Sequence, residues 1–239
     1  MFYKDRDIRG AIFDIDGTII DSPSLYHQYL NQELERIGCQ LVSKDFLFRN
    51  LGMGISLRDI LRKVISDSGK DEIVEAIADG ILEQFMKVDM EIALLSGVKE
   101  TFSFLKAKGV KIGLATGRTS SAAYEWKRFT HIDLAVFINA IVTAAEVDNR
   151  KPAPDIIAHC AKKLHIVPEN CIVVGDSTSD VIAARVAGAI PVAVCTGVDD
   201  IEKLKEAGPE AVIERLDSLM GCFNRTKEQN IPSKYLLVR

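Results

Sequence analysis

The chain has 239 residues, 47% of them hydrophobic, which is enough to bury one large core or a core with a smaller partner. Its 30 basic and 34 acidic residues give a formal net charge of −4, so nothing favours nucleic acid or an anionic membrane as a partner. The first ten residues do not resemble a signal peptide and no apolar stretch approaches membrane-spanning length, so we expect a cytoplasmic protein.

Short apolar runs alternate with helical patterns along most of the chain, which predicts a parallel sheet with helices on both faces. The predicted strands cover residues 8–15, 110–115, 134–138, 171–175, 190–194 and 211–213. Amphipathic helices lie between them; in residues 98–109, for example, Val98, Phe102 and Leu105 form one apolar stripe. The fold class is therefore α/β, with a Rossmann-like, doubly wound parallel sheet as its core.

One section interrupts the alternation of strands and helices. Residues 22–94 contain no convincing strand, and their apolar residues recur at helical spacing, as Leu30, Leu34 and Ile37 do. We interpret this section as a helical domain inserted into a core formed by residues 1–21 and 95–223. Residues 224–239 form a polar tail with no structural assignment.

Polar residues follow several of the predicted strands at the points where the apolar runs stop. In a parallel sheet covered by helices, the carboxyl ends of the strands lie at one edge and carry the functional groups. This rule brings together Asp14 and Asp16, Thr116 and Gly117, and Asp176; Lys151 comes from a loop shortly before the last of these strands, and Asp180 opens the helix after it. Ser177 and Asp180 also fit a capping box at the start of a helix.

Four short motifs occur in a fixed order along the chain: DIDGT at 14–18, LATG at 114–117, RKPAPD at 150–155 and VGDSTSD at 174–180. Together with the helical insertion after the first motif, this set resembles the haloacid dehalogenase superfamily. The closest resemblance is to its phosphoglycolate phosphatase and β-phosphoglucomutase branch, which has a helical cap. The likeness runs from about residue 8 to about residue 223 and implies a phosphatase that hydrolyses a small phosphomonoester.

The resemblance also implies roles for individual residues. Asp14 would be the nucleophile that forms an aspartyl phosphate, and Asp16 would be the general acid and then the general base. Mg²⁺ would be held by Asp14, the backbone carbonyl of Asp16, and Asp176, with support from Asp180. The phosphoryl oxygens would be bound by Thr116, Gly117 and Lys151.

The charges give a separate reason to expect a cation. Two carboxylates about 4 Å apart repel by roughly 4 kcal/mol at an effective dielectric of 20. A divalent ion has twice the charge and lies at about half that distance, so each attraction is roughly four times each repulsion. An acidic cluster built from Asp14, Asp16, Asp176 and Asp180 therefore indicates Mg²⁺.

The resemblance implies that the substrate is a small phosphorylated metabolite, phosphoglycolate-like or a sugar phosphate, whose identity the sequence does not fix. Arg49, Arg58 and Arg118 are candidate contacts for an anionic substrate. Where the phosphoglycolate phosphatases commonly have Asn after the Ser or Thr of the second motif, this chain has Gly117 followed by Arg118. Tyr124, on the helix that follows, is expected to pack rather than to contact a ligand.

Two alternatives remain. A β-phosphoglucomutase-like enzyme would use the same two aspartates, but this chain has Leu57 where such a mutase has a basic residue, and His27 falls one position away from the matching histidine. A receiver-like phosphoacceptor module also combines acids, a Thr and a Lys around Mg²⁺. Its acidic residues are usually adjacent, whereas Ile15 separates Asp14 from Asp16 here.

Overall fold

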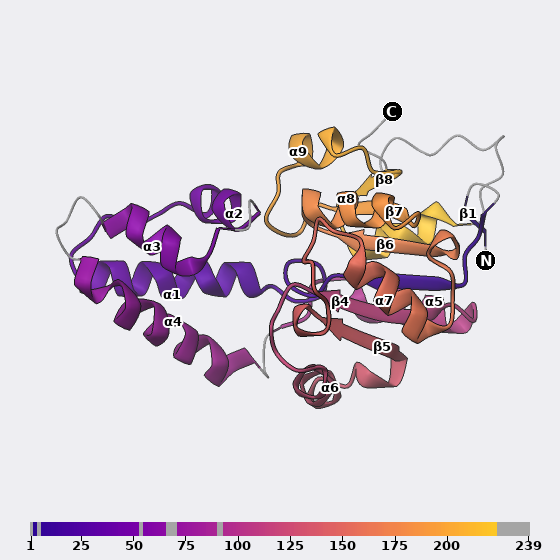
Figure 1. The fold of residues 1–239 in the computed structure, drawn as a ribbon, viewed down its shortest axis with the longest axis horizontal. Helices are drawn as coiled ribbons and strands as arrows, with labels where there is room; N and C mark the ends of the chain where they lie inside the picture. Colours follow the sequence, from indigo (N-terminus) through magenta and orange to yellow (C-terminus); the bar gives the residue numbers. More distant parts are fainter. Residues whose placement is uncertain (1, 4–5, 53–54, 66–70, 90–92, 224–239) are drawn as a thin grey trace.

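The computed structural model describes residues 2–3, 6–52, 55–65, 71–89 and 93–223. In this part of the chain, six parallel strands form one sheet in the order β5-β4-β3-β6-β7-β8 (Figure 1). Their bounds are β3 Gly10–Phe13, β4 Lys111–Thr116, β5 Ile138–Thr143, β6 Cys171–Gly175, β7 Ile190–Val194 and β8 Ala211–Ile213. Two short antiparallel strands, β1 Phe2–Tyr3 and β2 Arg6–Asp7, precede them.

The chain reverses its direction across the sheet at β3. It first adds β4 and β5 on one side of β3, and then returns to add β6, β7 and β8 on the other. Parallel pairing in register places Phe13 opposite both Leu114 and Val174, so β3, β4 and β6 end at similar levels. The carboxyl end of β3 is therefore a topological switch point, where open α/β sheets commonly bind ligands.

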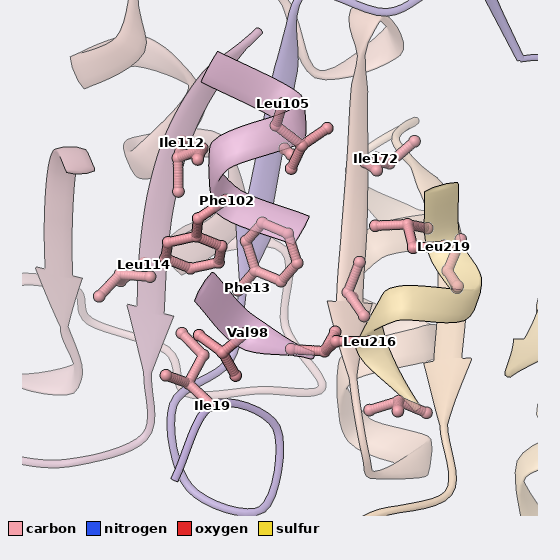
Figure 2. Packing of buried hydrophobic residues seen from close by; sticks show 14 of the residues in the cluster. Phe13, Ile19, Val98, Phe102, Leu105, Ile112, Leu114, Ile172, Leu216 and Leu219 are labelled. Carbon is pink, nitrogen blue, oxygen red and sulfur yellow. The ribbon is translucent and has the colours of Figure 1, made fainter. Parts of the chain in front are cut away.

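Side chains of β3 alternate between two apolar layers. Ala11 and Phe13 belong to a core with the helix α5 (Val98–Ala107), α6 (Ala122–His131) and the 3₁₀ helix η7 (Leu216–Cys222), and Figure 2 shows Phe13 against Phe102 of α5. Ile12 points into the opposite layer with α7 (Asp155–Leu164) and α8 (Thr178–Val186). Both faces of the sheet are thus covered, and α9 (Ile201–Glu206) packs at the β8 edge. Short 3₁₀ helices η5 (Ala144–Glu146) and η6 (Pro168–Asn170) lie in the connections.

Between β3 and β4 the chain forms a separate helical body, which we call the helical insertion (Figure 1). It consists of α1 Ser22–Arg36, α2 Lys44–Gly52, α3 Leu57–Ile65, η2 Asp71–Ile73 and α4 Val74–Val88. Its own core includes Leu30, Leu34, Ile60 and Ile77. Tyr26 of α1 and Phe85 of α4 stack within the helical insertion, with ring centroids 4.3 Å apart, and both pack against the apolar core of the sheet unit.

One predicted strand is misplaced. Residues 134–138 form mainly a 3₁₀ helix, η4 (Ala135–Phe137), and the strand begins only at Ile138 and runs to Thr143. Val136 in the predicted segment is 67% exposed. The apolar run therefore marks the approach to the strand rather than the strand itself. No helix in the described part of the chain combines the length and hydropathy needed to cross a membrane.

Candidate active site

Three carboxylates meet at the carboxyl ends of β3 and β6. Asp14 directly follows β3, Asp176 directly follows β6, and Asp180 lies in the first turn of α8. One oxygen from each lies within 4.8 Å of the others. Asp176 and Asp180 are buried, and Asp14 is only 9% exposed. The structure thus assembles an oxygen-rich group of hard ligands from two distant parts of the sequence, residue 14 and residues 176–180.

Asp176 is held by neighbours from the loops on both sides. The buried hydroxyl of Thr18 donates to its Oδ1 at 2.8 Å, and the amide of Val198 donates to its Oδ2 at 2.9 Å. Gly17 has φ +82° and a Cβ there would lie 2.6 Å from the same carboxylate, so the turn that presents Thr18 requires glycine. Sequence reasoning assigned no role to Thr18, although it stands in the same turn as Asp16.

Asp180 is fixed by the start of α8. The amide and hydroxyl of Ser177 donate to its Oδ2 at 3.2 and 2.5 Å, and its own amide donates to the Ser177 hydroxyl. The predicted capping box is therefore confirmed. Because the box occupies Oδ2, Oδ1 of Asp180 is the oxygen that contacts Lys151.

Lys151 reaches this group from the turn before α7. Its Nζ donates to Asp14 Oδ1 at 2.5 Å, to Asp180 Oδ1 at 2.6 Å and to the carbonyl of Ala115 at 2.7 Å. Its side chain is 9% exposed. The ammonium of Lys151 thus contacts two of the three carboxylates, and the group is left with excess negative charge.

The excess negative charge contributes to the raised pKa values of this group. Burial raises the pKa of Asp14 well above its usual value and the charges of Asp180 and Asp176 add to this, while Lys151 opposes it. Burial, with the charge of Asp180, raises the pKa of Asp176 to about 7 despite the hydrogen bonds from Val198 and Thr18. Burial disfavours the charged form of Lys151, but Asp14 and Asp180 outweigh it and raise its pKa.

Asp16 lies two residues from Asp14 but in a different environment. The guanidinium of Arg118 donates from Nε to Oδ2 and from Nη2 to Oδ1, both at 2.6 Å, and the Ser22 hydroxyl also donates to Oδ1. Burial favours protonation of Asp16, yet the charge and hydrogen bonds of Arg118 and the Ser22 bond prevail and lower its pKa. The side chain of Asp16 is thus separate from the three-carboxylate group.

Arg118 does not have a free guanidinium to offer a substrate. Its Nη1 donates to both oxygens of Asp89, at 2.9 and 3.1 Å, while its other edge holds Asp16. Asp89 ends α4 of the helical insertion, and Tyr124 of α6 also donates to it at 2.9 Å. Sequence reasoning missed Asp89, which belongs to no motif, and Tyr124 makes a specific polar contact beyond the packing predicted for it.

Of the remaining predicted residues, two lie at the site and two do not line its cavity. Thr116 ends β4 and is buried, and its Oγ1 accepts a hydrogen bond from the Arg118 amide at 3.1 Å. Gly117 lines the cavity next to the carboxylates. Arg49 and Arg58 are not among the residues that line it; Arg58 instead pairs with Glu75 and Asp79 on the helical insertion. The structure therefore does not bring these two arginines to the site.

The cavity beside the carboxylates has a volume of about 660 Å³. Its floor includes Asp14, Asp16 and Lys151, and the helical insertion contributes Tyr26 and Leu51 to its walls. An adjacent hollow of about 530 Å³ lies on the other side of Arg118 and is bordered by α4 and α6. The space suits a small molecule enclosed between the sheet unit and the helical insertion.

The ordered motifs and this geometry agree with a sequence profile described as haloacid dehalogenase-like hydrolase, which matches residues 11–194. The chain belongs to this family. It is 26% identical over 250 residues to phosphoglycolate phosphatase of Shigella boydii serotype 4 (strain Sb227), covering 97% of this chain and 98% of the relative.

A second relative, the phosphorylated carbohydrates phosphatase of Thermotoga maritima (strain ATCC 43589 / DSM 3109 / JCM 10099 / NBRC 100826 / MSB8), is 30% identical over 209 residues. The match covers 87% of this chain and 94% of that protein. Among solved structures, a predicted phosphoglycolate phosphatase from Haemophilus somnus 129pt superposes with a TM-score of 0.77 at 18% identity, covering 90% of this chain and 97% of the other. That likeness concerns the fold.

Proposed function

We propose that this member of the haloacid dehalogenase-like hydrolases is an Mg²⁺-dependent phosphatase of small phosphomonoesters that works through an aspartyl phosphate on Asp14. The observation that carries the proposal is the group of Asp14, Asp176 and Asp180, whose oxygens lie within 4.8 Å of one another beside a small-molecule cavity. Relatives named as phosphatases of phosphoglycolate and of phosphorylated carbohydrates support the substrate class.

The residues present fit a magnesium ion. Three carboxylates offer the hard oxygen ligands that Mg²⁺ prefers, and the raised pKa values of Asp14 and Asp176 reflect charge that a cation would neutralise. Asp14, Asp176 and Asp180 would hold the ion, together with the backbone carbonyl of Asp16. When bound, Mg²⁺ would neutralise charge on the phosphoryl oxygens and keep these carboxylates ionised.

Asp14 is placed to attack phosphorus. One of its oxygens forms a new bond to phosphorus while the bond from phosphorus to the leaving oxygen breaks, and the leaving oxygen takes the bonding electron pair. Lys151 orients Asp14 through its 2.5 Å contact with Oδ1. All three N–H groups of that ammonium already donate to Asp14, Asp180 and the Ala115 carbonyl, so Lys151 would stabilise the phosphoryl oxygens through its charge, while the Gly117 amide and the Thr116 hydroxyl would donate to them. Thr116 Oγ1 accepts from Arg118, so its own O–H remains available to donate.

Asp16 lines the same cavity and moves the protons. In the first step it would give a proton to the leaving oxygen, which departs as an alcohol. In the second, the ionised Asp16 would take a proton from a water molecule as the water oxygen attacks phosphorus and the bond to Asp14 breaks. Arg118 and Ser22 favour the ionised form needed for the second step.

The helical insertion would act as a cap. Tyr26 and Leu51 line the same cavity as the carboxylates, so this body would limit the size of the substrate and the access of water. A volume of about 660 Å³ accommodates phosphoglycolate or a monosaccharide phosphate, and is too small for a folded protein surface.

The test is phosphate release from phosphoglycolate, sugar phosphates and p-nitrophenyl phosphate, with and without Mg²⁺. We expect continuous release that requires Mg²⁺ and falls at least about 10³-fold in Asp14→Asn, which keeps the shape of the side chain and removes the nucleophile. Undiminished release by Asp14→Asn contradicts the proposal. Isomerisation of a sugar phosphate without release of phosphate would indicate the mutase, and uptake of about one phosphoryl group per chain would indicate the receiver-like module.

A further inference from the structure

Arg118 connects two carboxylates that come from different bodies of the molecule. One edge of its guanidinium holds Asp16 of the sheet unit through two 2.6 Å hydrogen bonds. Its remaining nitrogen, Nη1, holds Asp89 at the end of α4 in the helical insertion. The guanidinium also lies over the ring of Phe85, 5.2 Å from its centroid. Because the guanidinium is planar and rigid, the position of Asp89 sets the angle from which Arg118 meets Asp16.

Asp89 is itself firmly held. Its side chain is fully buried, and besides Arg118 it contacts the Tyr124 hydroxyl at 2.9 Å and Nη2 of Arg128 at 3.2 Å. Nε of Arg128 donates to the backbone carbonyl of Asp89 at 3.0 Å. Two residues of α6 therefore clamp both the side chain and the backbone at the end of α4.

The clamp is in turn built on α6. The buried side chain of Arg128 pairs with Glu125 one turn earlier, at 3.0 Å, and the Ser120 hydroxyl donates to the other oxygen of Glu125 at 2.6 Å. Ser120 lies two residues after Arg118, so the network closes on the loop that carries Arg118. The direction of the Arg118 side chain is thus fixed at its guanidinium by Asp89 and at its backbone by the Ser120 contact with Glu125.

Stability alone is a weak reason for such a network. Burying ionic groups carries a desolvation cost, and well-packed apolar residues of similar volume usually stabilise a junction at least as well. Tyr26 and Phe85 of the helical insertion already pack against the apolar core of the sheet unit and so join the two bodies. What the charged network adds is a defined orientation of the carboxylate that lines the cavity, Asp16.

We propose that Asp89 is a positioning residue for the reaction: acting through Arg118, it fixes the direction of the Asp16 carboxylate towards the oxygen of the leaving group. The inference rests on the proposed function, because it assumes that Asp16 handles the leaving-group proton. It assigns a role in the chemistry to a residue of the helical insertion that does not line the cavity. The end of α4 thereby helps to orient the carboxylate that transfers the proton.

The experiment compares two esters of similar size in wild type, Asp89→Asn, Arg118→Met and the double variant. Benzyl phosphate needs its leaving oxygen protonated, whereas p-nitrophenyl phosphate releases a stable anion without help. The measured quantity is kcat/KM, which includes the departure of the alcohol and excludes the later hydrolysis of the aspartyl phosphate. In Asp89→Asn, we expect about a 10- to 100-fold loss for benzyl phosphate and less than about a threefold loss for p-nitrophenyl phosphate.

Arg118→Met should give the same selective loss, and adding Asp89→Asn to it should not change the ratio between the two esters, since Asp89 acts through Arg118. Equal losses on both esters in Asp89→Asn, or a full further effect in the Arg118→Met background, would overturn the inference. A purely structural role would lower both rates together. Thermal melting checks the fold of each variant.

If Asp89→Asn does not fold, Arg118→Lys provides the test, because a lysine keeps the charge but cannot hold both carboxylates in the same fork. A selective loss on benzyl phosphate then supports the inference, and equal losses reject it. The two proposals fail separately: an Asp14→Asn variant that is still active rejects the proposed function, whereas an inactive one combined with unselective losses in the variants above rejects only the role of Asp89.

Discussion

The carboxylates of the site lie in two halves whose electrostatic environments shift the pKa in opposite directions. In the half built from Asp14, Asp176 and Asp180, three acids share one ammonium, and the pKa values of Asp14 and Asp176 are raised. In the half around Asp16, Arg118 holds the carboxylate with two hydrogen bonds and the pKa is lowered. Under the proposed function the first half would take a cation from solution, whereas the second has the guanidinium of Arg118. Metal dependence should therefore be confined to one half.

The largest expected effect comes from removing a charge in the half that needs a cation. Asp176→Asn should lower kcat/KM on p-nitrophenyl phosphate by at least about 10²-fold at fixed Mg²⁺ and raise the Mg²⁺ concentration required for half-maximal rate. Asp199→Asn is the matched control, since Asp199 is also buried near the site but bonds the Thr178 amide and Lys203. Equal losses in the two variants would show that Asp176 has no special relation to the metal.

The second prediction concerns stability and distinguishes the three-carboxylate half of the site from the half around Asp16. Lys151→Met leaves Asp14 and Asp180 without their common partner, so we expect the free energy of unfolding to fall by about 3 kcal/mol without metal and to recover in part with Mg²⁺. Arg118→Met should cost about 1–3 kcal/mol whether or not Mg²⁺ is present. Denaturant unfolding with and without Mg²⁺ measures both. Recovery of Arg118→Met by Mg²⁺ would place Asp16 and Asp89 in the metal-dependent half.

The third prediction concerns pH. Asp14 and Asp176 bind protons more tightly in the folded protein, so between their ordinary value of 3.8 and about 7 the folded state holds protons that the unfolded state has released. The free energy of unfolding of the metal-free protein should therefore fall as the pH rises through this range. Asp16, with its lowered pKa, acts in the opposite sense: the stability it contributes is lost as the pH falls through that lowered value.

Saturating Mg²⁺ should reverse this fall near pH 7, adding about 2.7 kcal/mol when its concentration is 100 times the dissociation constant. Denaturant unfolding at a series of pH values, with Mg²⁺ and with a chelator, measures the two curves. A metal-free protein whose stability rises steadily from pH 4 to pH 7 would contradict the account of this half.

The smallest expected effect concerns Thr18, whose hydroxyl holds the proposed metal ligand Asp176. Thr18→Val removes the 2.8 Å hydrogen bond to Asp176 and keeps the shape of the side chain. We expect the apparent affinity for Mg²⁺ to fall about 10-fold or somewhat more, with kcat at saturating Mg²⁺ nearly unchanged. A Mg²⁺ titration of the rate measures this. Thr101→Val is the control, because Thr101 is equally buried but lies on α5, away from the cavity.

The fold could be predicted to the extent that its strands are short apolar runs with helices between them. The segment at 134–138 shows where this signal fails: η4 uses apolar residues in a 3₁₀ turn, while β5 includes the exposed Asn139, whose side chain accepts from the Ile112 amide. Composition does not distinguish an apolar turn from a strand. The position of the helical insertion between β3 and β4 followed from the loss of strand signals after the first motif.

The site could be predicted where motifs end strands, because the parallel sheet brings those ends together whatever their separation along the chain. The hydrogen-bond partners of Arg118 could not be predicted in this way. Arg118 lines the cavity, and its contact with an anionic substrate stays a prediction, but its guanidinium nitrogens donate to Asp16 and Asp89. Asp89 follows an ordinary amphipathic helix and has no local signal, since its role depends on how α4 meets α6.

The proposed reaction requires that Asp14 become transiently phosphorylated. The direct measurement uses Asp16→Asn with p-nitrophenyl phosphate and Mg²⁺: this leaving group departs without a proton, while loss of the base slows hydrolysis of the intermediate, which should accumulate. Acid quenching, borohydride reduction and peptide mass spectrometry should then find homoserine in place of the aspartate at position 14, and only after exposure to the ester. Homoserine at another position, or an unmodified peptide after a measured burst of p-nitrophenol, would contradict the account.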